Sequence, residues 1–256
     1  MSIADQIAEV REHIAAACAR VHRPIESVTL VAVSKTHSAP LLIEAALAGI
    51  RDFGENRVEE ADKIGVVEQA IARENSAATL SWHMIGHVQS RKARDVLAHY
   101  QWIHSLDSFK LAEKYARLLP LSSASNAAPP EPLNVLLEMN VSGEMSKEGL
   151  DASQWDSSTA QRESLWNEVR RIIELPHLRV RGLMTVAPNT EGADSEATRP
   201  VFAKLRRLQT ALAADFPGAP WDTLSMGMTD DYAVAIEEGA TMIRVGRAIF
   251  GARQPL

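Results

Sequence analysis

The sequence lacks several features that mark common classes of protein. Cys18 is the only cysteine among 256 residues, so an internal disulfide is impossible and a cysteine-based zinc site is disfavoured. No apolar run approaches the ~20 residues that a membrane-spanning helix needs. Residues 1–23 mix acids and bases and have no long apolar stretch of the kind found in signal peptides. These absences predict a cytoplasmic protein without a membrane segment.

An excess of positive charge is also missing. The chain has 27 Lys and Arg against 33 Asp and Glu, which gives a formal net charge of -6. A protein that binds nucleic acid through its phosphates needs a basic face, so neither nucleic acid nor an anionic membrane surface is an expected partner. The hydrophobic content of 46% is ordinary for a globular protein with a true core.

Strand-like and helical patterns alternate along the chain. Apolar residues recur at helical spacing from Ile3 to His22 and predict a leading helix. Strand-like segments follow at 28–33, 51–54, 80–85, 102–105, 135–141, 178–186, 223–226 and 241–245. Helical patterns follow them at 39–48, 58–72, 90–98, 108–119, 165–175, 198–214 and 231–238, with a short turn into Phe250. This order predicts an α/β fold, a (β/α)8 TIM barrel with an extra N-terminal helix, as a single domain over 1–256. An open doubly wound sheet is the alternative.

Two polar stretches are predicted to be surface insertions. Residues 120–132 are rich in Ser, Ala and Pro, and residues 151–164 have few aliphatic side chains. The alternation resumes after each, so neither is predicted to be a linker between domains.

Lys35 closes the first strand, in Val33-Ser-Lys-Thr-His37. A lysine at the mouth of a buried strand loses basicity when it is desolvated and becomes a nucleophile toward aldehydes. Taken alone, a strand-end lysine that reaches into water is the simpler interpretation.

The last two strand-to-helix loops, 224–231 and 244–251, carry residues suited to an anion. In TIM barrels the phosphate site is often built by these loops. Ser225 offers a hydroxyl, Gly227 and Gly246 allow close approach of backbone amides, and Arg244 and Arg247 add positive charge. Barrel closure places the last strand beside the first, and neighbouring strands lie ~4.8 Å apart. The pattern predicts a pocket for a phosphorylated pyridine aldehyde, with ordinary turn chemistry as the simpler reading of each glycine.

Other strand ends offer further candidates. Asn56 is either a pocket residue or the N-cap of the following helix. His83 is either a core histidine with a satisfied partner or a pocket wall, and we favour the wall. His83 and His87 are four residues apart, which suits a metal pair only on a helix; since the segment is predicted to be a strand, no metal site is expected.

Together these segments resemble a known family. Val31-Ala-Val-Ser-Lys-Thr36, Phe53-Gly-Glu-Asn56, 82–89, Arg181-Gly-Leu-Met184, 224–231 and 244–251 are similar to motifs of the pyridoxal-phosphate (PLP) homeostasis proteins, single-domain relatives of the N-terminal barrel of alanine racemase. The resemblance implies that Lys35 forms an internal aldimine with PLP. It also implies that Ser225, Gly227, Gly246 and the amide of Arg247 hold the phosphate, and that Arg244 faces the ring or the phosphate. Arg247 departs from the family, which usually has a small residue there, often Thr or Ser.

A complete catalytic set is not evident from the sequence. A racemase needs two bases, one on each face of the substrate carbon. Lys35 could be one, but the three tyrosines, Tyr100, Tyr115 and Tyr232, all read as helical or helix-flanking residues. The residues therefore predict a bound cofactor without a complete catalytic set. The family resemblance implies a non-catalytic carrier of PLP that acts in vitamin B6 homeostasis, with apo forms of PLP-dependent enzymes as candidate recipients. A monomer is the expected state. A PLP-dependent amino-acid racemase, a Schiff-base aldolase without cofactor, and a scaffold with a vestigial pocket are the alternatives.

Overall fold

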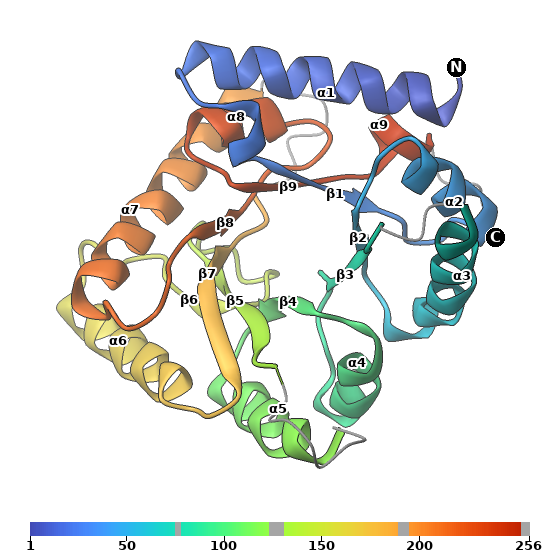
Figure 1. Cartoon of the computed structure of the whole chain (residues 1–256). Helices are drawn as coiled ribbons and strands as arrows, with labels where there is room; N and C mark the ends of the chain where they lie inside the picture. The colour runs from blue at the N-terminus through green and yellow to red at the C-terminus, as the bar shows by residue number, and fades with distance from the viewer. Residues whose placement is uncertain (75–77, 123–130, 189–194, 252–256) are drawn as a thin grey trace.

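Eight parallel strands form a closed ring at the centre of the computed structural model, with the helices outside it (Figure 1). The structure describes residues 1–74, 78–122, 131–188 and 195–251. The strands of the ring are β1 (Thr29–Val33), β2 (Asp52–Glu55), β3 (Ser81–Met84), β4 (Trp102–Leu106), β5 (Leu133–Asn140), β7 (Leu178–Met184), β8 (Thr223–Ser225) and β9 (Met242–Val245). A two-residue strand, β6 (Leu150–Asp151), pairs with β5 beside the ring.

Two strand pairings decide between the predicted folds. β4 pairs with β5, and β1 pairs with β9, where Val31 lies opposite Arg244. Since the first and last strands are neighbours, the sheet has no open edge. The TIM barrel prediction is confirmed, and the open doubly wound alternative is wrong.

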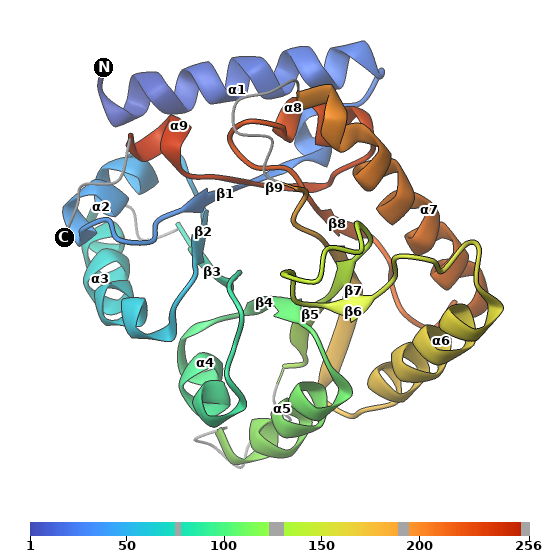
Figure 2. The same cartoon turned by 180° about the vertical axis from the view of Figure 1, so that it is seen from behind.

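Helices of amphipathic sequence surround the ring (Figure 2). They are α1 (Ile3–Arg20), α2 (Ala39–Leu47), α3 (Ile64–Glu74), α4 (Ala93–His99), α5 (Phe109–Ser122), α6 (Thr159–Ile173), α7 (Arg199–Asp215), α8 (Tyr232–Glu237) and α9 (Arg247–Phe250). Short 3-10 turns are η1 (Ile25–Ser27), η2 (Val58–Lys63), η3 (Ser90–Lys92) and η4 (Ser195–Thr198). The predicted leading helix is α1; it begins at a capping box between Ser2 and Asp5 and packs against α2, α8 and α9. No helix in these described ranges is long and apolar enough to cross a membrane.

The segment 151–164 is more ordered than its composition indicates. Ser158 caps α6, which begins six residues before the predicted start at 165 and carries polar Gln161, Arg162 and Glu163 in its first turns. Trp155 is buried and stacks on Trp166, with ring centroids 6.2 Å apart. The segment lies at the surface as predicted, since most of its residues are exposed, but it is anchored by Trp155 and continues into α6. Most of the other predicted insertion, 123–130, lies outside the described residues.

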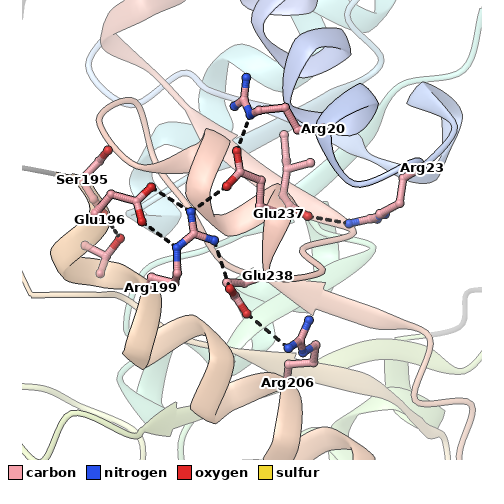
Figure 3. Close-up of polar contacts among 10 residues, drawn as sticks. Arg20, Arg23, Ser195, Glu196, Arg199, Arg206, Glu237 and Glu238 are labelled. Carbon is pink, nitrogen blue, oxygen red and sulfur yellow. Dashed lines mark hydrogen bonds and ion pairs between the residues drawn. The ribbon is translucent and has the colours of Figure 1, made fainter.

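An ion-pair network ties α1 to the C-terminal half of the chain (Figure 3). Arg199 of α7 contacts Glu196 and Glu237, each at 2.6 Å, and Glu238 at 3.1 Å. Arg20 of α1 reaches the same Glu237 at 2.5 Å. Because several charges share partners, the network holds α1 against α8 more firmly than one isolated surface pair would.

Buried polar side chains lie inside the ring among apolar ones such as Val31. Trp82 of β3 faces out, since its indole donates to Glu68 of α3 at 3.0 Å. Successive strand residues point to opposite faces, and His83 accordingly lies inside, fully buried. His104, Ser225 and Arg244 are also buried polar residues of the interior.

Candidate cofactor site at the mouth of the barrel

The turn that carries Lys35 lies beside the loop that follows β9. A Cβ atom on Gly246 would lie 3.3 Å from the carbonyl oxygen of Val33, the last residue of β1. His37 stacks on Phe250 at the end of α9, with ring centroids 4.8 Å apart. The half-buried Lys35 stands between Val33 and His37 in the chain. Strand closure therefore brings the predicted lysine and the predicted anion loop to one place.

A half-buried lysine binds both ends of this turn. Lys63 donates from Nζ to the carbonyl oxygens of Ser34, at 2.8 Å, and His37, at 3.2 Å. Its third partner is Glu55, at 2.9 Å. Thr36 has a φ of 66°, a strained value for a β-branched residue, and its amide donates to Glu60 at 2.9 Å. These contacts hold the backbone around Lys35 in a conformation it would not adopt alone.

Two glutamates under the turn share one proton. Burial and a hydrogen bond to Glu60 raise the pKa of Glu55 to about 8, although Lys63 and Ser34 oppose the shift. Burial also disfavours the charged form of Glu60, but bonds from Glu55 and the amides of Thr36 and Asn56 outweigh it and lower the pKa of Glu60. Glu55 is thus the protonated member near neutral pH.

Arg244 is the charged group on the other side of the mouth. It is only 4% exposed, and it donates from Nη1 to Ser225 Oγ at 2.6 Å and from Nη2 to the Thr185 carbonyl oxygen at 2.9 Å. Burial lowers its pKa to about 10, against the opposing effect of Glu138 and Asp231. No carboxylate of the described ranges forms an ion pair with it. A buried cation in this situation favours an anionic ligand.

The loop after β8 is hydrogen-bonded to strand β9. The amide of Arg244 donates to the carbonyl oxygen of Gly227 at 3.0 Å. Gly227 has a φ of 92°, and a Cβ there would lie 2.6 Å from that of Ala235 on α8. Glycine is therefore required at 227 for the turn itself, whatever it binds.

Several predicted site residues lie differently from the expectation. The hydroxyl of Ser225 is fully buried between Arg244 and His104, so it is engaged inside the barrel and not in the outer loop. His83 is a core histidine with partners in Asp52 and His104, which corrects its interpretation as a pocket wall. The Arg247 side chain is exposed and pairs with Asp230.

Asn56 is not a helix N-cap. The 3-10 turn that follows it begins at Val58, and the residue at its N-cap is Arg57. Asn56 instead lines a cavity of about 350 Å³ with Val88, Gln89 and Lys92 among its other walls.

The sequence reasoning missed the residues that support the site. A single polar residue in a strand or turn carries no sign of the partner that it meets, so the sequence does not predict the roles of Glu55, Glu60, Lys63 and His104. Only Glu55 has a recognisable sequence signal, because in Gly54-Glu-Asn56 an acidic residue directly follows the buried residues of a strand.

Comparison with known proteins places the chain in a family. The family model for the N-terminal domain of alanine racemase matches residues 7–254. An alanine racemase of Clostridium difficile shares the fold, with a TM-score of 0.67 at 13% identity over 96% of this chain and 60% of that one. The fold and the lysine at the mouth thus define a barrel of the alanine racemase type.

Closer relatives narrow the assignment. The pyridoxal phosphate homeostasis protein of Pseudomonas aeruginosa is 42% identical over 98% of this chain and 96% of its own length, and that of Escherichia coli K12 is 41% identical over 98% and 97%. PipY of Synechococcus elongatus, solved with PLP bound, is 33% identical with a TM-score of 0.75 and covers 98% of this chain and 100% of its own. This chain belongs to the pyridoxal phosphate homeostasis protein family.

The shared proton predicts a pH dependence of stability. The folded protein binds the Glu55 proton more tightly than the unfolded chain does, since the pKa rises from 4.5 to about 8. The stability from this group is therefore complete below pH ~4.5 and is lost as pH rises through ~8. Glu55→Gln keeps an acceptor for Ser34 and Lys63 and cannot ionise. We expect the wild type to lose about 1–3 kcal/mol relative to Glu55→Gln between pH 5 and pH 8.5.

Urea unfolding of both proteins at these two pH values measures the difference. Glu12→Gln, at an exposed position on α1, is the control and should follow the wild type. Parallel curves for wild type and Glu55→Gln would contradict the shared proton.

Proposed function

We propose that this protein binds PLP through Lys35 and acts in PLP homeostasis without catalysing a turnover. The observation that carries the proposal is the buried Arg244 on β9, the strand next to the one that leads into the lysine turn, with no ion-pairing carboxylate in the described part of the chain. An anionic ligand that also reacts with an amine satisfies both groups. The names of the curated relatives and the PLP-bound PipY structure support the same ligand.

The residues at the mouth fit such a cofactor. When bound, PLP supplies an aldehyde that bonds to an amine and a pyridine ring that withdraws electrons. Lys35 would provide the amine, while the backbone of Gly227, Gly246 and Arg247 would hold the phosphate. Gly246 leaves its amide uncovered by a side chain, and Arg244 would contact the ring or the phosphate from below. We keep Asn56 as a neighbour of the cofactor through its backbone next to Glu55, and assign His83 and Ser225 to the support of Arg244.

The absence of turnover is proposed from the position of the tyrosines. Tyr232 lies on α8 and its hydroxyl contacts His13 of α1 at 3.2 Å, on the outside of the barrel. Tyr115 is fully buried in α5, and Tyr100 is buried after α4. None is arranged as a second base opposite Lys35. Delivery of PLP to apo enzymes is the role that remains for a reversible covalent site.

Removal of the amine tests the binding mode. Lys35→Ala should lose the visible absorbance band that PLP gives when bonded to a lysine, because the substitution removes the amine that follows β1. The absorbance spectrum of each purified protein, titrated with PLP, measures this. Lys110→Ala, at an exposed position on α5, should titrate like the wild type. A wild type that stays colourless with added PLP would overturn the proposal.

Blocking the anion loop tests the phosphate site. A Cβ on Gly246 already lies 3.3 Å from Val33, so the side chain of Gly246→Leu would cover the end of β1. We expect an increase of at least about tenfold in the dissociation constant for PLP, with thermal unfolding still cooperative. Gly218→Leu, where a Cβ meets nothing within 4 Å, is the matched control. Equal affinities in the two variants would remove Gly246 from the site.

Chiral analysis tests the absence of turnover. L-alanine incubated with the PLP-loaded protein should yield no more D-alanine than with Lys35→Ala. Inversion of many equivalents of alanine per protein would show a racemase.

A further inference from the structure

A line of hydrogen-bonded side chains crosses the inside of the barrel from Arg244 to Asp52. Arg244 Nη1 lies 2.6 Å from Ser225 Oγ, which lies 2.9 Å from His104 Nδ1. His104 Nε2 lies 2.9 Å from His83 Nδ1, and His83 Nε2 lies 3.0 Å from Asp52 Oδ1. The line starts at Arg244 on β9 and ends at Asp52, the first residue of β2; both residues pair with Val31 of β1, which lies between these strands.

The two ends fix the direction of every bond between them. A guanidinium only donates and a carboxylate only accepts. Ser225 Oγ therefore accepts from Arg244, and its own proton is left for His104 Nδ1. His104 then carries its proton on Nε2 and donates to His83 Nδ1. His83 in turn carries its proton on Nε2 and donates to Asp52. All donors point from the candidate site toward Asp52.

The surroundings of His104 support a neutral imidazole. The residue is fully buried, and burial, the neighbouring His83 and Arg244 lower its pKa well below the usual range. A second proton on His104 would turn Nδ1 into a donor, so that Ser225 would face two donors. The Ser225 proton would then need another acceptor in a space that the barrel encloses.

A line of hydrogen-bonded polar side chains is unusual in the core of a barrel. Interiors of these barrels are filled mainly by bulky branched apolar residues, and buried polar groups stabilise less than apolar ones unless all are satisfied. Trp102 packs against His83, with ring centroids 5.6 Å apart and nearly parallel planes. The core thus holds the line in place at a cost in stability, and a role at the site accounts for that cost.

We propose that His104 is a positioning residue: it accepts the Ser225 proton so that Ser225 holds Arg244 toward the cofactor, and His83 and Asp52 fix the tautomer of His104 that can do so. The inference rests on the proposed function only for the cofactor that Arg244 meets. Its hydrogen-bond pattern is a property of the chain without ligand.

The first experiment reads the tautomers directly. Two-dimensional 15N NMR of the PLP-free protein separates protonated from unprotonated imidazole nitrogens, and His104→Asn and His83→Gln assign the signals. We expect both His83 and His104 to be neutral with the proton on Nε2. A proton on Nδ1 of His104, or a doubly protonated His104, would overturn the proposal.

The second experiment asks whether the acceptor matters for the cofactor. The Oδ1 atom of asparagine can take the place of Nδ1, whereas leucine offers no acceptor. We expect His104→Leu to raise the dissociation constant for PLP at least about tenfold and to shift the visible band of the bound cofactor, and His104→Asn to restore most of both. His99→Asn, at an exposed position, is the control.

Equal losses in the leucine and asparagine variants, or no loss in either, would contradict the positioning role. A wild type that takes up no PLP would contradict the proposed function. The NMR result would still decide the direction of the hydrogen bonds between Arg244 and Asp52. If His104→Leu does not fold, the tautomers of the wild type and the affinity of His104→Asn remain as the tests.

Discussion

The pairing of β1 with β9 is the interaction on which the site depends. It sets Val31 opposite Arg244 and Ala32 opposite Val245. That register places the turn after Val33 against Gly246 and stacks His37 on Phe250. A slip of one residue in strand register turns each side chain of the strand to the other face of the sheet. Such a slip between β1 and β9 would therefore separate the lysine turn from Arg244. The ion pairs that hold α1 over α8 strengthen the fold at this same seam.

Buried charge is arranged differently on the two sides of the mouth. Under the lysine turn, Lys63 meets a pair of glutamates that hold one proton, so the cluster is nearly compensated within itself. On the other side, Arg244 donates hydrogen bonds to neutral partners, the Ser225 hydroxyl and a backbone carbonyl oxygen. The positive charge of Arg244 therefore remains available to a ligand. In the proposed site, this asymmetry would favour an anion near the last two loops and an aldehyde near the first.

The sequence predicted the frame of the site better than its interior. Periodicity located all the strands of the ring, and the lysine at the end of the first strand followed from its place after an apolar run. The burial of Ser225 was not predictable, because its position depends on His104 from a strand across the barrel. The exposed ion pair of Arg247 with Asp230 joins two loops and was likewise hidden. Contacts between strands that are distant in the chain leave no periodic trace in the sequence.

The central claim is that the amine of Lys35 bonds to PLP. The most direct measurement is a mass spectrum of the protein after incubation with PLP and reduction with borohydride, followed by proteolysis. The account predicts one pyridoxyl group per chain, located on the peptide that contains Lys35. A protein without added mass, or with the group mainly on another lysine such as Lys63, would contradict it.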